Sequence, residues 1–180
     1  SNLNFYLFSK SAAVSVFYLN FEKYFSFSSK NDSQFYYAIG DLIGDGNNYL
    51  VINEKNKISA YGKNGTMAEG FPIDVPRGEE FCGNINLVDF NGDSINDVLV
   101  STKNGKLICF DGLTKQKLFD YSIGYSNSSI SYLTHFDNKL HYISINDSGY
   151  FQLIQISKEQ REISWVLDKG NFLRQGSVGE

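Results

Sequence analysis

The sequence has little of several residue types and patterns that would point to a particular class of protein. Its two cysteines, Cys82 and Cys109, are too few for a disulfide framework. No run of 18 or more apolar residues occurs, so no membrane span is predicted. Basic residues (16) are fewer than acidic ones (20), and no basic block is present. This charge pattern argues against nucleic acid as a partner.

Helix signals are also scarce, because no long window repeats Ala, Leu, Glu and Lys at helical spacing. Proline occurs twice and methionine once, whereas the chain has 12 Tyr, 15 Phe and 16 Gly. Aromatic and β-branched residues favour strands, and Gly and Asn favour the tight turns between them. The composition therefore predicts an all-β fold.

An acidic loop between two apolar runs carries the most chemistry. Oxygen-bearing side chains stand at positions 1, 3, 5 and 9 of residues 89–97: Asp89, Asn91, Asp93 and Asp97. With the carbonyl of Ile95, they would supply five oxygen ligands, as calcium prefers. The same side chains could instead bond their own backbone amides and form a self-bonded turn. The sequence leaves both interpretations open. The calcium interpretation predicts one site, and this loop is that site.

The loop recurs with a fixed period. Asp41, Asp89 and Asp137 are each 48 residues apart, and each is followed by alternating strands and turns. Four-stranded units of 40–50 residues are typical of β-propeller blades. We therefore expect one propeller segment over 1–180, with strands of a partial blade in 1–34 and blades over 35–82, 83–130 and 131–180. Strands are expected over 57–61, 85–88 and 106–110, with a turn over 111–114. The last blade is expected to end with a strand over 162–167.

The three copies are unequal. The first keeps Asp41 and Asp45, with Asn47 as a further oxygen, and forms a weaker candidate metal site. Ile43 and Tyr49 stand where oxygen ligands are wanted. The third copy is shortened after Asp137 and is expected to hold no metal.

Residues 39–46 (IGDLIGDG) and 87–93 (LVDFNGD) resemble the repeats of the FG-GAP/VCBS-like β-propeller family. The resemblance covers about residues 35–156, and Gly70-Phe71-Pro72 fits the end of such a repeat. It implies calcium at the loop and a secreted, periplasmic or cell-surface setting. It is poorly specific for activity, because the family is similar across integrin α heads, bacterial adhesins and secreted lyases.

At 48 residues per blade, 180 residues give fewer than four blades (180/48 is about 3.75). An open arc leaves apolar sheet faces uncovered. We therefore expect a homo-oligomer, or a piece of a larger propeller with a large apolar contact surface.

The predicted function is a non-catalytic, calcium-stabilised binding or scaffold module whose ligand is a protein or a glycan. One alternative is part of a propeller-fold polysaccharide lyase or another secreted carbohydrate-active enzyme. Such an enzyme needs converging Lys, Arg, Tyr or His side chains, and the sequence has no evident set. A second alternative is a structural spacer without a ligand.

Overall fold

The computed structural model describes residues 4–8, 13–18, 23–28, 36–63, 65–124, 128–146, 148–156 and 163–165. Every regular element in these ranges is a β-strand, which confirms the all-β prediction. Within the same ranges, no helix has the length and hydropathy needed to cross a membrane.

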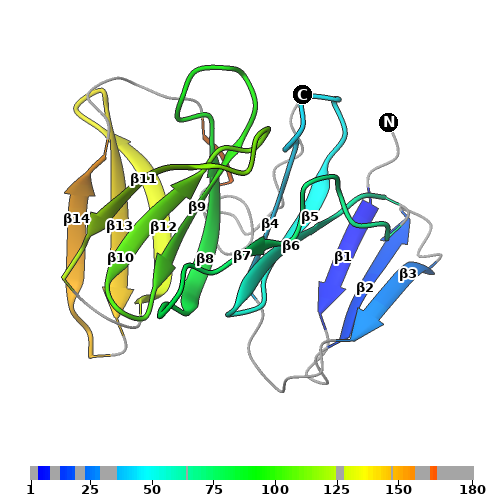
Figure 1. Ribbon diagram of the computed structural model, residues 1–180, viewed down its shortest axis with the longest axis horizontal. Helices are drawn as coiled ribbons and strands as arrows, with labels where there is room; N and C mark the ends of the chain where they lie inside the picture. Colours follow the sequence, from blue (N-terminus) through cyan, green and yellow to red (C-terminus); the bar gives the residue numbers. More distant parts are fainter. Residues whose placement is uncertain are drawn as a thin grey trace.

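The strands form four antiparallel sheets that follow one another along the chain (Figure 1). The N-terminal sheet contains β1 (Asn4–Phe8), β2 (Ala13–Tyr18) and β3 (Lys23–Ser28). The first complete sheet contains β4 (Tyr36–Gly40), β5 (Tyr49–Asn53), β6 (Lys57–Tyr61) and β7 (Ile73–Asp74). The middle sheet contains β8 (Phe81–Val88), β9 (Asp97–Thr102), β10 (Lys106–Phe110) and β11 (Lys117–Ser122). The third sheet contains β12 (Ser128–Phe136), β13 (Lys139–Asn146) and β14 (Phe151–Gln155).

The first complete, middle and third sheets stack face to face like the blades of a propeller. The first strands of successive sheets lie next to one another, because β8 contacts both β4 and β12. Consecutive strands pair in order outward from there, so each sheet is a simple meander. The predicted partial propeller of three to four blades is therefore confirmed.

The central strands β5 and β9 are buried on both faces, as a stacked sheet requires. Residues of β5 and β9 are buried along their whole length. One apolar cluster lies between the first complete sheet and the middle sheet, and includes Val51, Leu87 and Val100. A second lies between the middle and third sheets, and includes Leu99, Leu133 and Tyr142. Burial of these apolar faces is the main force that holds the stack together.

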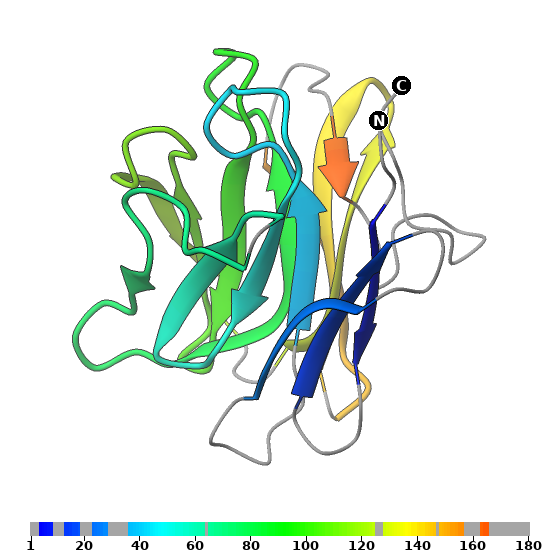
Figure 2. The same cartoon turned by 90° about the vertical axis from the view of Figure 1, so that its right-hand side faces the viewer.

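One predicted strand lies in a different place. Residues 162–167 were expected to complete the third sheet, but β15 (Ile163–Trp165) pairs with β8. It extends the middle sheet on the side of β8 opposite to β9, and it also contacts β4 (Figure 2). The prediction was wrong because apolar alternation identifies a strand but not the edge that it joins. The third sheet consequently has three strands among the described residues.

The inner strand of the middle sheet is longer than its apolar run. β8 begins at Phe81, whereas the sequence predicted a start at Ile85. The added residues include the buried Asn84, and Asn86 within the run is also buried. Asn84 donates to the Ser131 carbonyl (3.3 Å) and Asn86 to the Ser131 hydroxyl (3.1 Å). Both side-chain NH2 groups therefore donate across the sheet interface, a contact that local sequence patterns do not reveal.

Candidate functional site

The β8–β9 loop, residues 89–96, is organised around the carboxylate of Asp89. One oxygen of Asp89 accepts from the amides of Gly92 (2.6 Å) and Asp93 (3.1 Å). The other accepts from the amide of Ser94 (2.9 Å). Gly92 and Ser94 adopt positive φ values of 84° and 68°, which turns the chain around the carboxylate. Asp89 therefore acts as the internal hydrogen-bond acceptor of the loop.

Asn91 and Asp93 are exposed and bond within the same loop. The Asn91 carbonyl oxygen accepts from the Asp93 amide (2.9 Å), and Asp93 accepts from the Ile95 amide (2.8 Å). The Asn91 side-chain amide donates to the carboxylates of Asp93 (3.1 Å) and Asp111 (2.9 Å). Asn91 thus joins this loop to the β10–β11 loop.

Asp97 faces inward and is fully buried. Its carboxylate accepts from the amides of Phe90 (2.8 Å), Asn91 (3.3 Å) and Gly112 (3.0 Å). Burial raises the pKa of Asp97 to about 6 and outweighs these three amides, which favour the charged form. The negative charge of Asp111 adds to the increase.

The side chains of this loop that are candidate calcium ligands are occupied by hydrogen bonds within the protein. Both oxygens of Asp89, Asp93 and Asp97 accept hydrogen bonds from the protein. Across the described part of the chain, no three His, Cys, Asp or Glu residues form a group that could hold a metal ion. The loop therefore has the hydrogen bonds of the self-bonded turn that the sequence left open beside calcium. Calcium at Asp89, Asn91, Asp93, Ile95 and Asp97 stays a prediction.

The β4–β5 loop, residues 41–48, repeats this geometry. The Asp41 carboxylate accepts from the amides of Ile43 (3.1 Å), Gly44 (2.8 Å) and Gly46 (2.7 Å). Gly44 and Gly46 have positive φ values of 74° and 75°, like Gly92 and Ser94 in the second loop. Two different loop sequences therefore adopt one conformation around a first-position Asp.

Asp45 bonds to Asn47 and to Tyr49, which stands at position 9 where an oxygen ligand is wanted. It accepts from the amide (2.9 Å) and side chain (3.0 Å) of Asn47, and from the hydroxyl of Tyr49 (2.8 Å). Burial and the bond to Asp45 raise the pKa of Tyr49 to about 12, so Tyr49 stays a neutral donor. The weaker predicted metal set of Asp41, Asp45 and Asn47 is likewise bonded within its own loop.

The third copy has no loop of this kind. Asp137 and Asn138 form a two-residue turn between β12 and β13, with φ values of 53° and 55°. Positive φ at both positions is typical of a tight hairpin turn, and Asn and Asp tolerate it.

Side chains and backbone lock the loops of adjacent sheets together. Asn96 donates to the Asp41 carbonyl from both its side chain (2.8 Å) and its amide (3.3 Å). Gly112 packs so closely that a Cβ there would lie 1.9 Å from the Asn96 carbonyl oxygen. We call residues 41–48, 89–96 and 111–116 the loop platform. It lies at one end of the stack, where the first two loops stand side by side (Figure 1).

The sequence identified the acidic residues of the platform but missed the residues that join its loops. Asn96 stands at position 8 of its loop, which is not a ligand position, and Asp111 was predicted only as part of a turn. The sequence contained a signal for the role of Asn96, because Asn48 occupies the same position 8 in the first loop. Repetition of a polar residue outside the ligand pattern suggests a structural role that ligand spacing does not explain.

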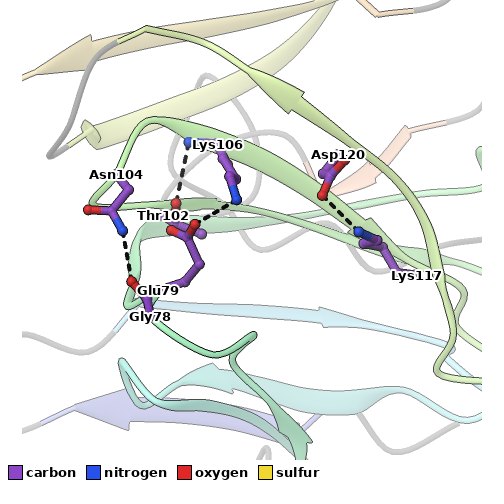
Figure 3. A network of polar contacts seen from close by, with 7 residues as sticks. All are labelled: Gly78, Glu79, Thr102, Asn104, Lys106, Lys117 and Asp120. Carbon is purple, nitrogen blue, oxygen red and sulfur yellow. Dashed lines mark hydrogen bonds and ion pairs between the residues drawn. The ribbon is translucent and has the colours of Figure 1, made fainter.

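A second polar network lies at the opposite end of the sheets (Figure 3). Lys106 pairs with Glu79 (2.8 Å), and Asn104 donates to the Gly78 carbonyl (2.8 Å). Hydrogen bonding to Lys106 lowers the pKa of Glu79 despite its burial. These contacts attach the β7–β8 connection to the β9–β10 hairpin.

Solved structures with the same architecture place the chain in a fold. The BBS1N structure in complex with ARL6DN, soaked with lead, matches with a TM-score of 0.64 at 10% identity. The match covers 89% of this chain and 51% of BBS1N. The computationally designed Ika4 protein matches with a TM-score of 0.50 at 18% identity, over 83% of this chain and 82% of Ika4.

The chain is a partial β-propeller. It spans about half the length of the BBS1N chain that it matches. No protein-family model matches it, and no curated protein does. The FG-GAP/VCBS resemblance therefore stays a prediction, whereas the propeller fold is established.

Proposed function

We propose that the chain is a non-catalytic binding module that recognises a protein through the loop platform. The observation that carries this proposal is the bonding between loops of adjacent sheets, by Asn96 to Asp41 and by Asn91 to Asp111. Rigidly held loops on a β-scaffold are a common location for binding surfaces. A preorganised surface loses less conformational entropy when a partner binds.

The exposed side chains of the platform support recognition of a protein. Leu113 is 53% exposed, and the other two loops of the platform carry the exposed acidic residues Asp45 and Asp93. A mixed surface of this kind offers an apolar contact with a charged rim. The propeller BBS1N, in its own structure, is in complex with another protein, ARL6DN. That complex supports a protein rather than a glycan as the first class of ligand to test.

Substitutions that alter the surface without breaking its internal bonds test the proposal. The tagged chain would be used for affinity capture from cells of its source, and captured proteins would be verified with purified components. We expect Leu113→Arg together with Asn48→Arg to weaken binding at least tenfold, a loss of about 1.4 kcal/mol. Arg77→Glu, an exposed change at the opposite end, is the matched control. Equal binding by the platform variant and the control would refute the platform as the binding site.

An enzyme assay addresses the alternative function. The purified chain would be incubated with a panel of uronic-acid polysaccharides, and new ultraviolet absorbance would report lyase products. The proposal predicts no turnover above a heat-inactivated control. Reproducible product formation would replace the binding module with the lyase alternative.

Calcium binding and a secreted, periplasmic or cell-surface setting remain separate predictions from the resemblance. Calcium that binds the native state would raise the Tm, and a chelator would lower it. The self-bonded loop predicts the same Tm in both conditions. Differential scanning fluorimetry with the wild type and Asp93→Ala distinguishes these outcomes, because a bound ion makes the calcium response depend on Asp93.

A further inference from the structure

The third sheet carries an apolar row on each face, but within the described residues only one face is covered by another sheet. Its strands alternate, so Leu133, Tyr142 and the partly buried Ile154 form a row that packs on the middle sheet. Leu133 and Tyr142 are 0% exposed. The adjacent row on the opposite face is Tyr132, Ile143 and Leu153. Leu153 is 48% exposed, and the sheet that would cover it is missing from the described residues.

Further apolar residues extend this uncovered row. Ile145 and Phe151 pair in the register next to that row, and Phe151 is 62% exposed. We call Tyr132, Ile143, Ile145, Phe151 and Leu153 the open face. A sheet face that stays in water normally carries polar residues at these alternating positions. An apolar set of this kind marks a contact surface.

The interface between the middle and third sheets indicates what kind of surface fits the open face. The middle sheet presents Val88, Leu99 and Cys109 toward the third sheet, and all three are 0% exposed. The third sheet presents the same kind of apolar row one blade further along. The matching occupant is therefore another stacked sheet. The edge strand β14 is also unpaired on its outer side within the described residues.

We propose that a second copy of this chain covers the open face, so that two copies close one propeller. The N-terminal sheet of β1, β2 and β3 stands at the other end of the arc (Figure 1). A two-fold axis would bring the open face of each copy against the N-terminal sheet of the other. Both ends of both arcs would be covered by two equivalent contacts.

Two observations favour a second copy over an unrelated protein. The arc aligns with about half of the BBS1N propeller, 51% of that chain, so two arcs supply the material of one closed ring. An unrelated partner would have to reproduce the stacked-sheet surface that the chain itself already carries.

The oligomeric state of the full chain tests the proposal. Sedimentation velocity and light scattering are expected to give twice the chain mass of 20.3 kDa. Phe151→Lys with Leu153→Lys should raise the dimer dissociation constant by at least tenfold, about 1.4 kcal/mol. Leu118→Lys, on the edge strand of the middle sheet, is the matched control and should leave the dimer intact. Circular dichroism checks that each variant is folded, and the milder Leu153→Ser replaces the double variant if that variant unfolds.

A photo-crosslinking residue at position 151 provides a second measurement. In a mixture of isotopically light and heavy chains, crosslinks should join position 151 of one copy to residues 4–28 of the other. A wild-type chain that stays monomeric at about 0.1 mM would overturn the proposal. Crosslinks that join two open faces to each other would also overturn it. The platform substitutions do not touch the open face, so loss of dimerisation and loss of partner binding are separate results.

Discussion

Asn96 shows how one side chain can couple two blades. Its amide group donates to the Asp41 carbonyl across the sheet interface at 2.8 Å. Asn48 occupies the same position of the preceding loop and is exposed. The same residue type in the same loop position therefore has two different environments, which gives a matched pair for mutation.

We expect Asn96→Ala to lower the free energy of unfolding by about 1 kcal/mol, because a partly buried hydrogen bond is lost. Asn48→Ala should change it by less than about 0.5 kcal/mol, as exposed substitutions usually do. Urea unfolding monitored by tryptophan or tyrosine fluorescence measures both values. Equal effects of the two substitutions would show that the inter-loop bond does not stabilise the stack.

Gly112 is required by a close backbone approach. An added Cβ would lie 1.9 Å from the Asn96 carbonyl oxygen, which belongs to the backbone of a locked loop. We expect Gly112→Ala to cost about 1–3 kcal/mol, the usual range for overpacking. Gly62→Ala is the control, because its Cβ would meet no atom closer than 3.6 Å. Chemical denaturation of both variants tests the difference, and a neutral Gly112→Ala would contradict the close approach.

The acidic residues of the β8–β9 loop show which local features the sequence could predict and which it could not. The spacing of Asp89, Asn91, Asp93 and Asp97 predicted a tight loop with an organised centre, and the loop has one. The spacing could not determine whether the carboxylates face an ion or the backbone amides, because both arrangements need the same oxygen atoms. One oxygen of Asp97 also accepts from the Gly112 amide, a contact with another loop that local spacing does not encode.

At the scale of elements, the ion pair of Glu79 and Lys106 joins a connection to a hairpin (Figure 3). Hydrogen bonding to Lys106 holds the pKa of Glu79 below its ordinary value of 4.5. The folded state therefore binds this proton less readily than the unfolded chain does. The resulting stability is present above about pH 4.5 and is lost as the pH falls through the folded pKa.

We expect Glu79→Gln to lower the Tm at pH 7 by a small amount, and to have less effect at pH 3. The difference shrinks because Glu79 is protonated in both states at low pH. Thermal unfolding of both proteins at a series of pH values gives the comparison. Asp74→Asn, an exposed carboxylate of β7, is the control for general charge effects. A difference that does not change with pH would contradict the role of the ion pair.

The strands themselves were predictable where apolar runs are bounded by turn residues. The predicted strands over 57–61 and 106–110 coincide with β6 and β10. The strand over 163–165 was predicted as an element but assigned to the wrong sheet. Strand existence depends on local alternation, whereas the choice of partner depends on which sheet edge is free in the folded chain.

At the scale of the whole molecule, the 48-residue period predicted the stacked architecture. Equivalent Asp residues at 41, 89 and 137 follow β4, β8 and β12, the three adjacent inner strands. The period also predicted an incomplete ring. The open face is the sheet surface that, among the described residues, lacks a neighbouring sheet because the ring is incomplete. What covers this face is a property of two molecules, so no single-chain pattern could specify it.

Closure of this arc of propeller sheets by a second copy predicts a ring made of two chains. Electron microscopy of the purified full chain at a concentration that supports the dimer tests it most directly. Class averages are expected to show closed rings with two-fold symmetry and sheets arranged around a central axis. Open arcs, or two arcs joined at one end only, would contradict the account.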